Sequence, residues 1–208
     1  MNAATATVAA EVVPASQRGF VHRRNFGYNI LELDVESRIA SADPDAMDLM
    51  PVLVSLDIAQ AFPSFAHPFI RLALQAMGAP VAVINFFDSM CHNILAMAPC
   101  AGMYVPLFYV RSGIIQGCGW SGTLFAMGTA SFLLNLETVL EVQGRGLCRA
   151  CADDLGLVLK AVAHLAHLAN VMVLMDILAG LALKAPKCHI IPSRGKSTPS
   201  SSSSYATR

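Results

Sequence analysis

The chain has 208 residues, enough for one domain with a substantial hydrophobic core. It is 55% hydrophobic and only 13% charged, and its 14 basic and 14 acidic residues cancel. Phosphate contacts supply much of the affinity of proteins for nucleic acid. Zero net charge therefore argues against a nucleic-acid enzyme, or indicates that the basic parts of one are absent.

The N-terminal part of the chain changes character at Gln17. Residues 1–16 are rich in Ala, Thr and Val, and we expect a disordered N-terminus there, without a secretory signal. From Gln17 onward the sequence holds a local basic cluster, Arg18, Arg23 and Arg24, followed by a helix-like run. We therefore expect the folded domain to begin at Gln17.

Strand-like and helix-like segments alternate through the rest of the chain, without the glycine-rich first turn of a nucleotide-binding Rossmann unit. The segment 193–208 is Ser-rich and predicted to be disordered. The interleaved order indicates the α+β class, a sheet packed on helices. The expected elements are a buried strand at 52–58, helices at 67–77 and 80–97, a strand at 103–111, a loop at 112–117, a helix at 121–141, a hairpin at 147–152 and 155–160, a helix at 162–179 and a strand at 184–191.

The cysteines lie in apolar stretches without the spacing of a disulfide framework, which indicates reduced, intracellular core residues. Cys148 and Cys151 form a CxxC sequence on a predicted strand. An offset of three along a strand points the two sulfurs to opposite faces, so we expect neither a disulfide nor a shared zinc there.

Two apolar segments are long enough to raise a membrane alternative, since the mean hydropathy of the chain is +0.54. Asp176 interrupts the segment 165–183, and Glu137 interrupts the segment 121–139. Acidic side chains are costly at the centre of a bilayer. Buried helices of a two-layer domain account for both segments, and no membrane is expected.

Three acidic residues stand out because apolar sequence surrounds them: Asp57 near the end of a predicted buried strand, and Asp153 and Asp154 in the stretch CADDLGLVL. An ionised carboxylate in apolar surroundings either neutralises or finds a cation. Taken separately, Asp57 is explained as a strand-end cap and the other pair as a solvated turn. If the two strands are neighbours in one sheet, the three carboxylates converge. They could then hold two Mg²⁺ ions for an in-line phosphoryl transfer.

Four sequence motifs follow one another along the chain, and their order carries a resemblance to a known family. LDIAQAFPSF, SGIIQGCGWSGTLFAMG, CADDLGLVL and LAGLALKAPKCHIIP resemble the palm of a reverse transcriptase (RNA-directed DNA polymerase), of the kind encoded by non-LTR (LINE-type) retrotransposons. The upstream QRGFVHRRN and NILEL resemble the junction of fingers and palm. The resemblance covers residues 17–192 and implies a palm-like antiparallel sheet packed on helices, with partial fingers and no thumb. It thus implies a truncated copy of a retroelement.

The resemblance also implies site roles. Asp57 and Asp153 would be the main ligands of two Mg²⁺ ions, with Mn²⁺ as a substitute, and Asp154 would lie beside them. Lys187 would be the lysine that protonates the leaving pyrophosphate, and Lys184 is the less favoured choice. The implied reaction is template-directed nucleotidyl transfer from a dNTP to a primer 3′-OH, with an RNA template and a DNA primer as partners.

Further matching positions concern the nucleotide and the template. Phe62 matches the bulky residue that presses on the sugar and excludes a 2′-OH, and Gln116 and Gly117 would lie against the template and incoming nucleotide. By the residue alone, Phe62 is more readily explained as a core side chain. Gln116-Gly117 could equally be an ordinary loop turn, and Lys187 a solvated lysine. Trp120, by departing from the family pattern, would place a bulky ring near the template path.

A second function hypothesis remains open beside the polymerase. It is a catalytically inert palm fragment that acts as an interaction module, because missing fingers and thumb would leave apolar surface exposed.

Overall fold

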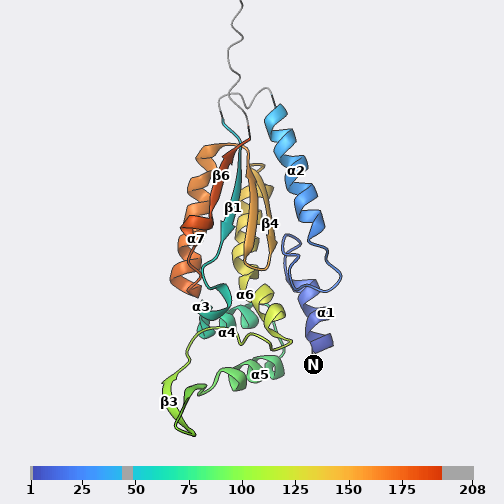
Figure 1. The fold of residues 1–208 in the computed structure, drawn as a ribbon. Helices are drawn as coiled ribbons and strands as arrows, with labels where there is room; N and C mark the ends of the chain where they lie inside the picture. The colour runs from blue at the N-terminus through green and yellow to red at the C-terminus, as the bar shows by residue number, and fades with distance from the viewer. Residues whose placement is uncertain (1, 44–48, 194–208) are drawn as a thin grey trace, which may run out of the picture.

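The computed structural model describes residues 2–43 and 49–193, and Figure 1 shows how their elements are arranged. The prediction of a disordered tail at 193–208 lies outside the described residues, apart from Ser193. The elements in chain order are α1 (Asn2–Val12), α2 (Gly27–Ala42), β1 (Val52–Asp57), α3 (Ala61–Ser64), α4 (His67–Ala76), α5 (Val81–Cys91), β2 (Leu95–Cys100), β3 (Met103–Tyr109), α6 (Ser121–Leu136), the π-helix η2 (Glu137–Val142), β4 (Gly146–Cys151), β5 (Asp154–Leu159), the 3₁₀ turn η3 (Val162–His164), α7 (Leu165–Ala179), the 3₁₀ turn η4 (Ala185–Lys187) and β6 (His189–Pro192).

A four-stranded antiparallel sheet forms the centre of the molecule, in the order β4-β5-β1-β6. Burial alternates along β1, because every second side chain of a strand points to the same face, whereas the last three residues of β5 are all buried. On the inner face of β1, Val52, Val54 and Leu56 are almost completely buried. The sheet packed on helices confirms the predicted α+β class.

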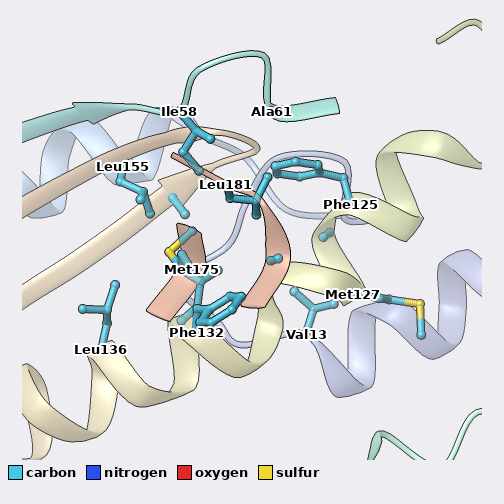
Figure 2. Packing of buried hydrophobic residues seen from close by; sticks show 14 of the residues in the cluster. Val13, Ile58, Ala61, Phe125, Met127, Phe132, Leu136, Leu155, Met175 and Leu181 are labelled. Carbon is cyan, nitrogen blue, oxygen red and sulfur yellow. The ribbon is translucent and has the colours of Figure 1, made fainter. Parts of the chain in front are cut away.

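Helices α6 and α7 cover the inner face of this sheet (Figure 1). Leu136 and Phe132 of α6 and Met175 of α7 belong to the same hydrophobic core as Leu155 of β5, and Figure 2 shows them packed together. Most of α6 is buried, and its last turns widen into η2, which keeps the chain helical to Val142. Gly180 ends α7 in the left-handed conformation, at φ +72°, as the sequence predicted.

Helix α2 packs against β4 and β5 on the other side of the sheet (Figure 1). Gly156 of β5 makes this close approach possible, because a β-carbon there would lie 2.6 Å from Cδ1 of Leu33.

One expected helix is shorter than predicted. The helix expected at 80–97 ends at Cys91, and β2 follows and pairs with β3 as a separate two-stranded sheet. The Leu-Ala-Met-Ala sequence of β2 favours a helix by local propensity. A turn at Ala101 (φ +48°) and Gly102 (φ +81°) nevertheless reverses the chain and pairs β2 with β3.

The expectation of a disordered N-terminus was wrong for residues 2–12, which form α1 and pack against α6. Its Ala9 is completely buried. The guanidinium of Arg24 donates hydrogen bonds to the carbonyl oxygens of Ala10 (2.9 Å) and Val13 (2.7 Å), and also bonds to that of Pro14. These bonds satisfy carbonyl groups at the end of the helix, which would otherwise lack partners. This segment is helical because of its tertiary contacts, which its composition does not reveal.

All six cysteines are free thiols. Cys148 is buried and Cys151 half-buried at alternating positions of β4, as expected for strand neighbours at an odd offset. Burial raises the pKa of Cys148 far above its ordinary value, and Glu141 adds to the shift. The expectation that all six are core residues was wrong for Cys100, which is exposed at the end of β2.

Two helices of the described residues are long and apolar enough to cross a membrane by length and composition: Ser121–Val142 and Val162–Ala179. The first is the core helix of the domain, with 67% of its apolar window buried. In the second only 28% is buried. The exposed side chains of its α7 part include Val173, Leu174 and Ile177.

Candidate active site

The three acidic residues meet at one end of the central sheet. β1 and β5 are direct neighbours, and the antiparallel register pairs Asp57 with Asp154. Paired residues have Cα atoms about 5 Å apart and side chains on the same face. Asp153 precedes Asp154 in the two-residue turn of the β4–β5 hairpin, next to Ala152. The structure therefore brings Asp57 together with Asp153 and Asp154, which lie almost a hundred positions later in the chain.

Negative charge accumulates at this end of the sheet. The pKa of Asp154 is raised above its ordinary value by burial first, and then by the carboxylates of Asp153 and Asp57. Lys187 opposes this shift. A set of carboxylates that raise one another's cost of ionisation is stabilised by a cation placed among them.

Lys187 supplies one positive charge at this site. Its Nζ lies 3.3 Å from Oδ2 of Asp57, and the pair is partly exposed. Lys187 ends the short turn η4, and the backbone N–H of Lys184 at the start of that turn donates a 2.8 Å hydrogen bond to the carbonyl oxygen of Asp57. The segment after α7 is thereby attached to the end of β1, with Lys187 directed at the carboxylates and Lys184 engaged through its backbone.

The donor set fits a hard divalent cation in its chemistry, because it consists of carboxylate oxygens. Within residues 2–43 and 49–193, however, no three His, Cys, Asp or Glu side chains are already arranged to hold a metal ion. The backbone places the carboxylates at one strand end, and a metal ion would require their side chains to turn toward a common point.

Phe62 lies five residues after Asp57, in α3, and it packs into an aromatic cluster. Its ring stacks on Phe125 of α6 at 4.7 Å between centroids and meets the edge of Phe20 at 5.9 Å. Phe62 is only partly buried, whereas Phe125 is completely buried. Phe62 is therefore held by core contacts while remaining partly exposed, and its expected contact with the sugar stays a prediction.

Gln116 and Gly117 lie in the loop between β3 and α6. The start of this loop is fixed to α3: the N–H of Gly113 donates to the carbonyl of Phe65 (2.8 Å), and that of Ile114 donates to the carbonyl of Phe62 (2.7 Å). Gln116 is exposed and borders an open pocket of about 560 Å³, whose lining does not include the three carboxylates. The structure thus connects this loop to the segment after Asp57, while leaving the predicted contacts of Gln116 and Gly117 a prediction.

Trp120 is buried, and its expected place near a template path stays a prediction. Its ring is 5% exposed and packs against Phe86 of α5, with 4.9 Å between ring centroids. Trp120 is therefore a core residue that joins α6 to α5, and its ring does not project into solvent.

A cluster of ion pairs behind the hairpin was not predicted from the sequence. Glu32 of α2 bonds to both Arg18 and Arg149, and Arg149 of β4 also bonds to Glu141 of η2 at 2.8 Å. Burial alone would raise the pKa of Glu32, but the hydrogen bonds and charges of the two arginines lower it below its ordinary value. Arg18, the first residue of the basic cluster, thus forms an ion pair within the fold.

Gln17 was also missed as a candidate residue. It is completely buried, and its side-chain amide bonds to the backbone of Ala152, next to Asp153. In the sequence, Gln17 stands two positions before Gly19, in the stretch QRG that precedes α2.

Comparisons with known proteins give one curated relative and several solved structures. No protein-family profile matches the sequence. The chain is 30% identical over 110 residues to a retrovirus-related Pol polyprotein from a type-1 retrotransposable element R2 of Popillia japonica. This match spans 50% of the chain and 18% of the polyprotein.

Telomerases are among the solved structures with a similar fold. Apo telomerase from Candida tropicalis, truncated from its C-terminal domain, matches with a TM-score of 0.72 and 10% identity, over 95% of this chain and 41% of that one. Telomerase from Candida albicans, in complex with a TWJ fragment of telomeric RNA, matches with a TM-score of 0.71 and 8% identity, over 95% of this chain and 35% of that one. The chain therefore spans less than half of each. Together, the similarity to a retrotransposon polyprotein and the fold shared with telomerase reverse transcriptases confirm that this chain resembles part of a reverse transcriptase domain and has a palm-like α+β fold.

Proposed function

We propose that this chain is a reverse-transcriptase-like domain that carries out template-directed nucleotidyl transfer. The observation that carries the proposal is the pairing of Asp57 with Asp154 across β1 and β5, with Asp153 in the adjoining turn and Lys187 3.3 Å from Asp57. Carboxylates at one strand end with a lysine beside them fit the chemistry of a triphosphate substrate.

In the proposed reaction, the 3′-OH of a DNA primer attacks the α-phosphorus of a dNTP. The new P–O bond forms as the bond to pyrophosphate breaks. Two Mg²⁺ ions, when bound, lower the pKa of the attacking hydroxyl and stabilise the leaving pyrophosphate. Asp57 and Asp153 would hold these ions, with Asp154 next to them.

The other side chains have positioning and proton-transfer roles in this proposal. Lys187 would give a proton to the leaving pyrophosphate, from a position that neutralises Asp57 when no substrate is bound. Phe62, fixed by its stacking on Phe125, would close the sugar side of the site against a 2′-OH. Gln116 and Gly117 would contact an RNA template and the incoming nucleotide.

Primer extension on an RNA template with Mg²⁺ tests this function. Asp153→Asn should reduce incorporation by at least roughly 100-fold, because even residues that only orient metal ligands are worth about 10- to 100-fold. Asp176→Asn is the matched control, since Asp176 is an exposed aspartate on α7, and it should leave the rate unchanged. Equal incorporation by wild type and Asp153→Asn, or none by either, contradicts the proposal.

The alternative function is an inert palm fragment that serves as an interaction module. Exposed apolar surface favours it: Tyr104, Leu107 and Phe108 of β3 and Ile177 of α7 are all more than half exposed. Mg²⁺ titration followed by thermal unfolding separates the two functions. An intact carboxylate site gains stability with Mg²⁺ by mass action, whereas an inert fragment shows no shift.

A further inference from the structure

The side chain of Gln17 makes an unusual set of contacts for a buried polar residue. Gln17 is completely buried. Its Oε1 accepts hydrogen bonds from the backbone N–H of Ala152 (2.8 Å) and of Gly19 (2.9 Å), and its Nε2 donates to the carbonyl oxygen of Ala152 (3.1 Å). One amide thus bonds to both backbone groups of the same turn residue, as a neighbouring strand would.

The turn that Gln17 holds is the one that carries Asp153. Ala152 is a non-glycine residue in the left-handed conformation, at φ +58°. This conformation costs free energy in a residue other than glycine, and it persists where surrounding contacts enforce it. The two hydrogen bonds from Gln17 are such contacts, because they fix the peptide groups on both sides of the Ala152 Cα.

The backbone around Gln17 is itself fixed against β4. The N–H of Ala150 donates to the carbonyl of Ser16 (2.8 Å), and the N–H of Arg18 donates to the carbonyl of Ala150 (2.9 Å). Gly19 lies so close to the turn that a β-carbon there would be 2.2 Å from the nitrogen of Ala152. The segment 16–19 therefore lies beside β4 through an isolated parallel bridge between Gln17 and Ala150, and the amide of Gln17 adds hydrogen bonds to the hairpin turn.

We propose that Gln17 is a positioning residue that fixes the hairpin turn so that Asp153 faces Asp57 across the end of the sheet. The proposal rests on the function proposed above for what Asp153 does, but the clamp itself is a property of the fold. Only a primary amide of this length both accepts from and donates to Ala152. Glutamate keeps the acceptor and loses the donor, and methionine keeps the length and loses both.

The test compares Gln17→Met and Gln17→Glu with wild type and with Leu74→Ala. Leu74 is completely buried in α4, which packs on α5, α6 and α7, so its truncation destabilises the protein away from the hairpin. The first measurement is the hydrogen-exchange rate of the Ala152 amide. The second is the Mg²⁺ concentration that gives half-maximal thermal stabilisation. The third is primer extension, which gives kcat and its own half-maximal Mg²⁺ concentration.

In Gln17→Met we expect exchange at Ala152 to be roughly ten-fold faster. The Mg²⁺ midpoint should rise several-fold, and kcat should fall roughly 10- to 100-fold, because Asp153 is no longer held in place. Gln17→Glu should restore part of the protection at Ala152. Leu74→Ala should lower the melting temperature at least as much as Gln17→Met does, but it should leave the Mg²⁺ midpoint unchanged.

Unchanged exchange at Ala152 in Gln17→Met, or an equal increase in Leu74→Ala, overturns the clamp. An unchanged Mg²⁺ midpoint in Gln17→Met overturns its connection to Asp153. If wild type responds to Mg²⁺ in neither assay, the proposed function fails, and the exchange rate at Ala152 still decides whether Gln17 holds the turn.

Discussion

Glu32→Gln removes the charge that joins α2 to strand β4. The wild-type carboxylate of Glu32 bonds to Arg18 and to Arg149 with separate oxygens. The variant keeps the length of the side chain but leaves two arginines that are only 16% and 15% exposed without this partner. Arg149 retains Glu141, and Arg18 retains Asn29 at 2.9 Å.

The size of the effect follows from these contacts. A hydrogen bond to a charged group contributes about 1.5–3 kcal/mol to the free energy of unfolding. Glu32 is about one-third exposed, so solvent weakens both bonds, and each arginine keeps one partner. We therefore expect the variant to lose about 2–3 kcal/mol. For a domain of this size, that lowers the melting temperature by roughly 4–12 °C.

Thermal and urea unfolding of wild type and variant measure this loss, with Glu36→Gln as the matched control one turn further along α2. Glu36 is paired with Lys160 at 3.8 Å, and its loss should cost less than about 1 kcal/mol. The pKa of Glu32 is lowered in the folded state, so its contribution is fully present above its ordinary value of 4.5 and is lost as pH falls through the folded pKa. If the two variants are equally stable at pH 7, or if the Glu32→Gln deficit persists at low pH, the network does not stabilise the fold as argued.

Three further predictions concern the hairpin, helix α1 and the cysteines. Gly19→Ala places a β-carbon 2.2 Å from the backbone of the hairpin turn, so we expect a loss of about 1–3 kcal/mol in urea unfolding and faster exchange in the turn. Arg24→Lys removes the planar donor that caps α1, which should speed proteolysis near the N-terminus, while Arg23→Lys, at an exposed position, should not. Iodoacetamide should modify exposed Cys100 in the native protein and leave buried Cys148 intact, and early modification of Cys148 would contradict the packing of β4.

Much of the central sheet could be predicted from the sequence because its strands are short apolar runs bounded by polar residues. The strand predicted at 52–58 is β1 at 52–57, and the hairpin predicted around Asp153-Asp154 forms with its turn one residue earlier, at Ala152-Asp153. The end of α7 was predictable because Gly180 adopts a conformation that glycine favours. In these places the local pattern and the tertiary structure agree.

The differences arise where distant contacts decide the local structure. Helix α1 is fixed by the guanidinium of Arg24 and by burial of Ala9 on α6, which its Ala/Thr/Val composition does not indicate. The composition of β2 favours a helix, and the segment is a strand because it pairs with β3. For the candidate site, the motifs predicted which acids would meet. They could not predict the role of Gln17, because a single glutamine before a glycine carries no pattern of its own.

The position of β1 has a consequence for the order in which the protein is built. This strand is made early, yet both of its neighbours in the sheet, β5 and β6, follow much later in the chain. During translation, β1 therefore has no partner strand while the segments between β1 and β5 are synthesised. The sheet is complete only after β6 has been synthesised, and such long-range pairing folds slowly.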